Sequence, residues 1–247
     1  MRVHPLDTAG ALAYISHCLS RQQACHIATV NPEFIVRARR DPAFRVLLDR
    51  CHLRTVDGVG VALALRWTRG LRAARVTGAD LILPLARLMA QSGESLFLLG
   101  AGPGVAAAAA VRLGELCPEV RVAGVLEGAP DPIEDEQTCA IIRESGARVL
   151  LVAFGAPAQE VWIARNLPRL GPCVAIGVGG ALDYLSGAVP RAPLWVRRCG
   201  LEWLYRLIRQ PRRLRRQLAL PVFVYLVAGQ AVRERRRRIS SDRDNDD

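Results

Sequence analysis

The sequence contains no lysine: all 34 of its basic residues are arginine. We attach no function to that choice, but the charge balance is informative, because the formal net charge is +11. A positive field of this size favours anionic partners, among them phosphates, nucleic acid and acidic lipid headgroups. The sequence therefore raises the question of which of these three anions the protein binds.

Aromatic residues are scarce, at 5% of the chain. Proteins that bind single-stranded nucleic acid stack bases on aromatic side chains, and no nucleic-acid-binding module is visible in the sequence. An arginine-rich nucleic-acid-binding protein is therefore an alternative only, and we expect no nucleic-acid partner.

Long apolar runs are also missing. A membrane-spanning helix needs about 18 consecutive apolar residues, whereas the nearest candidate, 218–229, is short, contains Pro221 and has arginine clusters on both sides. The apolar stretch at the N-terminus is short and broken by polar residues, unlike that of a signal peptide. We expect a cytoplasmic protein that does not span the membrane and that lies peripherally on its inner face, against acidic lipid.

The seven cysteines are scattered and form no C-x-x-C motif, as in a cytosolic protein whose thiols stay reduced. Three adjoin histidines, at 17–18, 25–26 and 51–52, but this spacing matches no zinc site, and neighbours on a strand point to opposite faces. No D-x-D motif follows an expected strand, and the acidic run 131–136 has the composition of a helix N-terminus. We therefore expect no metal, no cofactor and a metal-independent mechanism.

Apolar β-rich runs alternate with helical patterns along most of the chain. This order predicts an α/β fold: a Rossmann-like, mainly parallel sheet with helices on both faces. Ligands bind such sheets at the carboxyl ends of the strands. The expected strands are 25–30, 53–56, 95–99, 120–125, 148–154 and 173–178, and the helices include 32–51, 79–92, 105–116 and 134–145.

The character of the sequence changes near residue 191, where strand signals stop and arginines, tryptophans and short apolar stretches take over. We expect an α/β catalytic core at 1–192, an arginine-rich helical, membrane-associating appendage at 193–238, and a disordered tail at 239–247. If 200–221 were one helix, Arg206, Arg209, Arg213 and Arg216 would share a stripe beside an apolar one, although Pro211 is positioned to break it.

Polar residues follow the first two expected strands. Thr29 and Asn31 stand at the end of one, before Pro32 opens a helix, and Asp57 stands at the end of the next, among glycines that permit close approach of a ligand. Asp57 has two interpretations, a helix N-cap or a catalytic carboxylate, and spacing alone favours the cap.

A glycine-rich turn, with Gly100, Gly102 and Gly104, precedes an alanine-rich helix and resembles a phosphate cradle. Val105 stands where a dinucleotide fingerprint needs its third glycine, so a tight turn or a site for one nucleotide is favoured. A nucleotide-dependent oxidoreductase built on this turn is the second alternative. Two later loops carry further polar candidates: Gln159 and Glu160 at a helix start, and Asp183 among four glycines.

Six segments, taken in order over roughly residues 25–216, resemble the WecG/TagA/CpsF family of bacterial glycosyltransferases. The resemblance implies an inverting, metal-independent hexosyltransferase of cell-surface polysaccharide synthesis. It implies transfer from a UDP-sugar, with N-acetylmannosamine, its uronic acid or glucose as the sugar, to a polyprenyl-diphosphate-linked saccharide. The segments are TVNPE, VDGVG, RVTGADL, GAPAQE, GVGGALDYLSGAVPRAP and GLEWLYRLIRQPRRLRR.

The resemblance also assigns roles to residues. It makes Asp57 the general base. The sequence departs from the family pattern at two places: Ala158 stands in place of a lysine, and the segment after Gly124 lacks an aromatic residue. Both departures bear on which donor sugar is used. The candidate substrate-binding residues are Thr29, Asn31, Arg75, Asp80, Gln159, Glu160 and Asp183, and the candidates for the nucleotide diphosphate are Gly100, Gly102, Arg206, Arg213 and Arg216.

Overall fold

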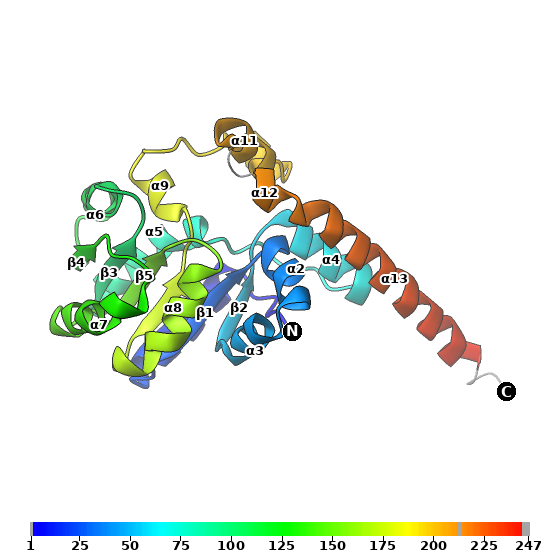
Figure 1. Cartoon of the computed structure of the whole chain (residues 1–247), viewed down its shortest axis with the longest axis horizontal. Coiled ribbons are helices and arrows are strands. Elements are labelled where there is room, and N and C mark those ends of the chain that lie inside the picture. Colours follow the sequence, from blue (N-terminus) through cyan, green and yellow to red (C-terminus); the bar gives the residue numbers. More distant parts are fainter. Residues whose placement is uncertain (1, 212–213, 244–247) are drawn as a thin grey trace.

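A computed structural model of the chain describes residues 2–211 and 214–243, and it has three layers, with helices on both faces of one parallel sheet (Figure 1). The six strands lie in the order β2-β1-β6-β5-β3-β4, and every neighbouring pair is parallel. The α/β, Rossmann-like fold class is confirmed. The strands are β1 (Cys25–Val30), β2 (Leu53–Val56), β3 (Ser95–Gly100), β4 (Arg121–Leu126), β5 (Val149–Ala153) and β6 (Val174–Gly177).

The strands alternate their side chains between two cores. On β3, Leu96 and Leu98 join the core beneath helices α1 (Thr8–Ser20), α5 (Gly78–Ser92), α6 (Val105–Leu116) and α9 (Ala181–Leu185). Phe97 and Leu99 face the opposite core, beneath α7 (Asp135–Glu144) and α8 (Ala158–Asn166). Burial on both faces explains why the strands appear in the sequence as continuous apolar runs.

The helix predicted at 32–51 is wrong in one respect, because two helices occupy this range: α2 (Pro32–Arg40) and α3 (Pro42–Arg50). Asp41 interrupts them with an extended backbone, φ −123° and ψ 98°, as expected for a residue before proline. Its carboxylate then accepts a hydrogen bond from the N–H of Phe44 and caps α3. The DP pair inside this helical pattern is the sequence signal for the break.

The C-terminal part is helical but is not one continuous helix. After α10 (Leu194–Arg198), helix α11 (Glu202–Arg209) ends at Gln210, beside Pro211, and α12 (Leu214–Gln217) and α13 (Ala219–Arg243) follow. The condition for a single stripe of four arginines, one helix over 200–221, is therefore not met. None of the described helices is long and apolar enough to cross a membrane. The short 3-10 turns are η1 (Pro132–Glu134) and η2 (Leu167–Arg169).

Helix α13 lies along α2 and α4 (Val59–Arg69) (Figure 1). Phe223 and Val227 of α13 are buried with Val36, Val56 and Val61 in one apolar cluster. Residues on both sides of the predicted boundary at 193 thus share a core. This packing places the C-terminal helices beside the carboxyl ends of β1 and β2.

Candidate active site

A cavity of about 940 Å³ opens at the carboxyl ends of β1, β2, β5 and β6. Its lining comes from the loops after these strands, from α4, and from the C-terminal helices α11 to α13. Most of the predicted site residues line it, namely Thr29, Asn31, Asp57, Arg75, Gly102, Gln159, Asp183, Arg206 and Arg216. The sheet brings these segments together because parallel strands end at the same edge.

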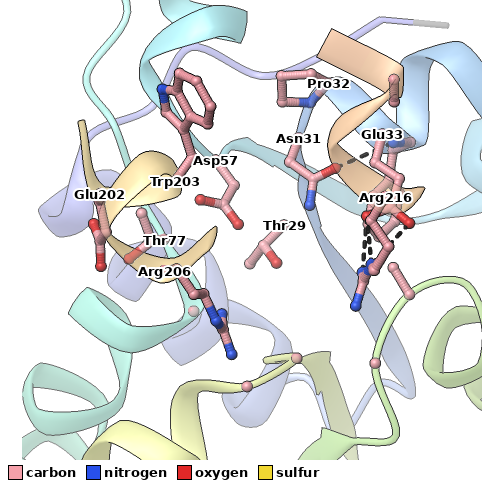
Figure 2. Close-up of a pocket in the computed structure, with 18 of the residues that line it drawn as sticks. Thr29, Asn31, Pro32, Glu33, Asp57, Thr77, Glu202, Trp203, Arg206 and Arg216 are labelled. Atoms are coloured by element: carbon pink, nitrogen blue, oxygen red, sulfur yellow. Dashed lines mark hydrogen bonds and ion pairs between the residues drawn. The ribbon is translucent and has the colours of Figure 1, made fainter. Parts of the chain in front are cut away.

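Asp57 follows β2 directly, and its N–H donates to the carbonyl of Val30 at 2.8 Å, which ties the ends of β1 and β2 together. Helix α4 begins just after it, but Gly58 is the N-cap residue, at φ 92°, and no side chain caps the helix. The N-cap interpretation of Asp57 is therefore wrong. Its carboxylate makes no hydrogen bond with any residue that the structure describes, and Figure 2 shows it pointing into the cavity.

The electrostatic setting of Asp57 favours a protonatable carboxyl. Burial raises its pKa to about 7, and the nearby carboxylates of Glu202 and Asp80 act in the same direction. The guanidinium groups of Arg75 and Arg206 oppose this effect. A carboxylate with a pKa near neutrality is suited to accept a proton from a substrate hydroxyl.

Thr29 and Asn31 stand beside Asp57 (Figure 2). The Thr29 hydroxyl donates to the carbonyl of Gly177 at 3.0 Å, so its oxygen lone pairs remain available to a ligand. The Asn31 side-chain oxygen accepts from the N–H of Phe34 and caps α2, which fixes the side chain while its amide nitrogen keeps two donors. These two residues are held in place by the fold and can still bond a sugar.

Arg206 reaches into the cavity from α11. Its guanidinium carbon lies 4.7 Å from the centroid of the Tyr184 ring, and its Nη2 lies 3.5 Å from the Asp183 carboxylate. Gly180 makes room for it, because a Cβ there would lie 2.0 Å from Nη2. Nε and Nη2 are buried without a hydrogen-bond partner among the described residues. A guanidinium at the wall of a cavity, ion-paired with Asp183 but with donors that make no hydrogen bond, is suited to bind a further anion.

Arg216 also lines the cavity, but the structure pairs it with Glu33 on α2. Its Nε and Nη2 donate to the Glu33 carboxylate at distances between 2.8 and 3.1 Å. This bidentate pair joins α12 to α2 and neutralises the arginine in this conformation. The third predicted arginine, Arg213, lies outside the described residues.

Asp80 has a different place from the one predicted. It is not among the residues that line the cavity; instead, it accepts a hydrogen bond from Arg191 at 2.6 Å and one from the Thr77 hydroxyl at 2.8 Å. Arg75, in contrast, does line the cavity, and it donates to the carbonyl of Arg197 at 3.3 Å. Both residues anchor the C-terminal helices, and Asp80 acts on the site through its charge alone.

The glycine-rich turn is occupied by the chain itself. The N–H of Gly104, at the start of α6, donates to the Glu127 carboxylate at 2.6 Å, which takes the place that a phosphate would have at this helix N-terminus. Gly100 lies outside the lining, and packing accounts for it, because a Cβ there would lie 2.8 Å from the Phe154 ring. This arrangement disfavours the oxidoreductase alternative. Gly102 remains a lining residue.

Gln159 and Glu160 face different surroundings. The Gln159 side-chain oxygen accepts from the N–H groups of Gly155 and Gly179, so it joins the loops after β5 and β6 at the cavity wall. Glu160 is fully buried and is not a lining residue. It accepts from the Gln159 amide at 3.0 Å and bonds the His26 imidazole at 2.6 Å. Direct binding of substrate by Glu160 is therefore a wrong prediction for this conformation.

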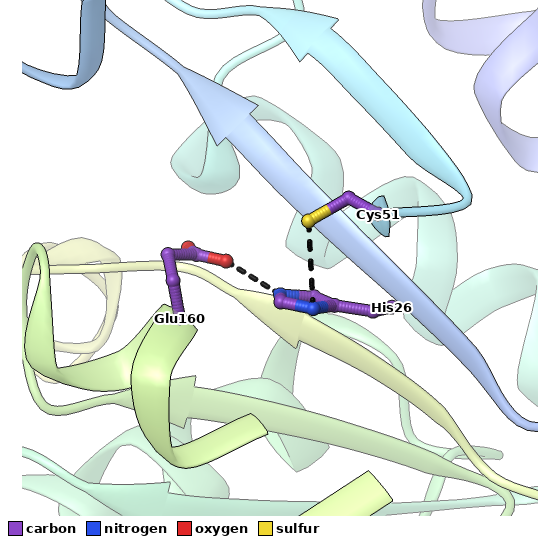
Figure 3. Close-up of side chains that lie close together, drawn as sticks. All are labelled: His26, Cys51 and Glu160. Carbon is purple, nitrogen blue, oxygen red and sulfur yellow. Dashed lines mark hydrogen bonds and ion pairs between the residues drawn. The ribbon is translucent and has the colours of Figure 1, made fainter. Parts of the chain in front are cut away.

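Cys51 lies on the far side of the same imidazole, with Sγ 3.5 Å from Nδ1 of His26 (Figure 3). His26, Cys51 and Glu160 carry metal-ligand atoms within 4.8 Å of one another. However, the thiol and the carboxylate face different ring nitrogens, so the three groups do not converge on one point. The geometry is that of a buried hydrogen-bonded chain leading from Cys51 to Gln159.

Sequence reasoning missed several lining residues, namely Glu33, Glu202, Trp203 and Tyr184. Glu33 belongs to the TVNPE segment and Tyr184 directly follows Asp183, so both are adjacent in sequence to predicted site residues. Trp203 and Glu202 lie in the appendage for which the sequence predicts association with the membrane. Their position over the core is a long-range contact, for which a single sequence gives no local signal.

Residues 1–237 match the Glycosyl transferase WecG/TagA/CpsF family. The chain belongs to this family. It is similar to the N-acetylglucosaminyldiphosphoundecaprenol N-acetyl-beta-D-mannosaminyltransferase of Bacillus subtilis (strain 168), at 32% identity over 213 residues, which cover 85% of this chain and 82% of that protein. The protein of the same name from Bacillus spizizenii (strain ATCC 23059 / NRRL B-14472 / W23) is 31% identical over 220 residues, covering 87% and 84%. The WecG/TagA/CpsF membership confirms the resemblance drawn from the six segments, and the protein is a glycosyltransferase.

Proposed function

We propose that this WecG/TagA/CpsF protein transfers a hexosyl group, of the N-acetylmannosamine type, from a UDP-sugar to a saccharide carried on polyprenyl diphosphate, with inversion at the anomeric carbon. The observation that carries the proposal is that Asp57 and Arg206 line the same cavity. The Asp57 carboxylate makes no hydrogen bond with a described residue, and Nε and Nη2 of Arg206, although the guanidinium is ion-paired with Asp183, have no hydrogen-bond partner among the described residues. The names of the two Bacillus relatives support the choice of acceptor and sugar.

The chemistry needs one base and one anion site. In a single displacement, Asp57 accepts the proton of the acceptor hydroxyl while that oxygen forms a bond to the anomeric carbon. The bond from this carbon to the diphosphate oxygen breaks, and UDP leaves with its electron pair. The charge that grows on the diphosphate is stabilised by fixed guanidinium donors, for which Arg206 is the residue best placed.

Thr29, Asn31 and Gln159 hold the sugars in this proposal. Thr29 and Asn31 are next to Asp57, where the acceptor hydroxyl must lie, and each keeps unused hydrogen-bonding capacity toward the cavity. Gln159 contributes through the two loops that it joins. Arg216 binds the diphosphate only if substrate displaces Glu33 from it.

The C-terminal helices supply a membrane-binding surface in this proposal. Exposed apolar residues are concentrated there, and Ile208 on α11 is 70% exposed while Trp195 on α10 is 67% exposed. An exposed apolar patch of this kind marks an interaction site, and arginines near acidic headgroups contribute about 1 kcal/mol each. We infer a peripheral location on the inner face of the membrane, where a lipid-linked acceptor is found.

The proposal is tested with purified full-length enzyme, a panel of UDP-sugars and a short-chain lipid-diphosphate saccharide, with and without EDTA. We expect UDP release and inverted product with UDP-N-acetylmannosamine, at a rate that EDTA does not change. Transfer only from a different UDP-sugar would correct the donor. No transfer and no UDP release from any sugar would contradict the proposal.

A further inference from the structure

Part of the cavity lining comes from α4 and α13, two helices that lie side by side (Figure 1). Helix α4 contributes Gly60, Leu63, Ala64 and Trp67, which recur at the three- and four-residue spacing of one helix face. Helix α13 contributes Leu220, Phe223, Val224 and Val227. We call this part of the cavity the apolar arm.

The lining of the apolar arm differs from that of the catalytic end. None of the described lining residues on α4 or α13 is charged, whereas Asp57, Arg206 and Glu33 all belong to the other end. The arm thus offers hydrocarbon surface without charge pairing. A flexible hydrocarbon chain fits such a surface, while a nucleotide or sugar would lose hydrogen bonds to water there.

The two ends form one continuous space. Helix α4 begins one residue after Gly58, so Asp57 stands at its start, while Trp67 lies near its end. Trp67 lies eight positions after Val59, which corresponds to about 12 Å of helix. Moreover, 940 Å³ lies near the upper limit of about 1,000 Å³ for sites that hold one drug-sized ligand, as expected of a cavity that holds two substrates.

The rim of the apolar arm is apolar and uncovered. Trp67 is 62% exposed and Val224 is 59% exposed, while Phe223 and Val227 below them are buried in the contact between the helices. A hydrocarbon chain of a ligand that leaves the cavity at this rim passes over apolar side chains. The opening therefore suits a ligand that continues into a lipid phase.

We propose that the apolar arm binds the first isoprenoid units of the lipid-linked acceptor, and that the arm directs the attached saccharide to Asp57. The proposal rests on the proposed function and extends it by a site for the lipid portion. Recognition of hydrocarbon here distinguishes a lipid-linked acceptor from a free saccharide. It also distinguishes the acceptor from the donor, which has no hydrocarbon chain.

The test uses two synthetic acceptors with the same saccharide diphosphate, one carrying a farnesyl group and the other a methyl group. The full-length enzyme is assayed in solution, without vesicles, so that membrane binding does not contribute. We expect wild-type kcat/KM to be at least about tenfold higher for the farnesyl acceptor, since each buried methylene contributes to binding. Farnesyl diphosphate alone should compete with the farnesyl acceptor.

Leu63→Asn and Val224→Asn place a polar group in the apolar arm at residues that are 37% and 59% exposed, so the fold should tolerate them. We expect both variants to bring the farnesyl-to-methyl ratio close to 1 and to weaken competition by farnesyl diphosphate at least about fivefold. The matched control is Val111→Asn, at a residue on α6 that is 66% exposed and outside the cavity, and it should keep the wild-type ratio.

Three outcomes overturn the inference. A wild-type ratio near 1 shows that no hydrocarbon site exists, and an unchanged ratio in both variants places such a site elsewhere. If the variants instead abolish a dimer that wild-type protein shows in sedimentation, a second copy of the chain covers the arm. Failure of the proposed function is distinct from all of these, because wild-type enzyme then transfers to neither acceptor.

Discussion

Arg206 lies over the ring of Tyr184, with its guanidinium carbon 4.7 Å from the ring centroid. The arginine comes from α11 and the tyrosine from the short helix after β6, so this contact joins the C-terminal helices to the core. Asp183 and Gly180 complete the surroundings of the guanidinium. The position of the proposed diphosphate ligand therefore depends on contacts between segments that are more than twenty residues apart.

Arg206→Ala should lower kcat/KM for the donor by about 100- to 1,000-fold, because it removes a fixed donor from the developing charge of the leaving group. Arg206→Lys should recover little, since an ammonium group does not reproduce the planar stacking on Tyr184. Inhibition by UDP should weaken in both variants. Arg112→Ala, at an exposed arginine on α6, is the control, and an equal effect there would exclude a specific role for Arg206.

Asp57→Asn should reduce kcat by about 100- to 10,000-fold with little change in donor binding, because the amide cannot accept the proton. Since the pKa of Asp57 is raised to about 7, wild-type activity should fall as the pH drops below 7 and the carboxylate is protonated. We expect kcat/KM to decline about tenfold per pH unit below this point. A flat profile between pH 5 and 8 would show that another group is the base.

The same residue should destabilise the wild-type protein at high pH. The folded-state pKa is raised from 3.8 to about 7, so the contribution of Asp57 is favourable at low pH and is lost as the pH rises toward 7. The full pKa shift corresponds to about 4 kcal/mol of folding free energy. Because Asp57 lines the cavity, solvent there screens its charge, and we expect a contribution of about 1–3 kcal/mol. Asp57→Asn should therefore raise the free energy of unfolding at pH 8 but not at pH 4.

Urea denaturation of both proteins at these two pH values measures this difference. Thr8→Ala, at the first residue of α1 and outside the cavity lining, is a suitable reference for effects of pH that do not involve Asp57. A stability difference between wild type and Asp57→Asn that does not grow between pH 4 and pH 8 would contradict the prediction.

Glu160→Ala should cost about 2–4 kcal/mol of stability, because it leaves the His26 ring and the Gln159 amide without their buried partner. It should also lower activity at a temperature where the variant is fully folded, since Gln159 joins two loops of the site. Glu160→Gln should retain far more of both, because its oxygen and its amide can serve Gln159 and a changed His26 tautomer. Denaturation and transfer assays test this, and equal losses in the two variants would contradict it.

Local patterns were sufficient for much of the fold. All six strands were expected within one or two residues at each end, because strands buried on both faces leave continuous apolar runs. The split between α2 and α3 was missed although the DP pair encoded it. The helix at Thr8–Ser20 was not predicted, and the helix at Val59–Arg69 was implied only by the N-cap interpretation of Asp57.

The candidate site, like the fold, was predicted only in part from the sequence. Thr29, Asn31 and Asp57 were found because residues at strand ends share one edge of a parallel sheet. In contrast, the pairing of Arg216 with Glu33 and of Glu160 with His26 joins residues more than 100 positions apart. A single sequence carries no periodic or spacing signal for such contacts.

The sequence by itself determined the sheet, the edge at which ligands bind, and the positive charge of the C-terminal part. The tertiary structure decided which polar groups are free. Asp57 and Arg206 line the cavity and have polar atoms without a hydrogen-bond partner among the described residues, whereas Asp80 and Glu160 use theirs within the fold. The physical reason is that a buried polar group must find a partner, and only the packed chain determines whether that partner is another residue or a substrate.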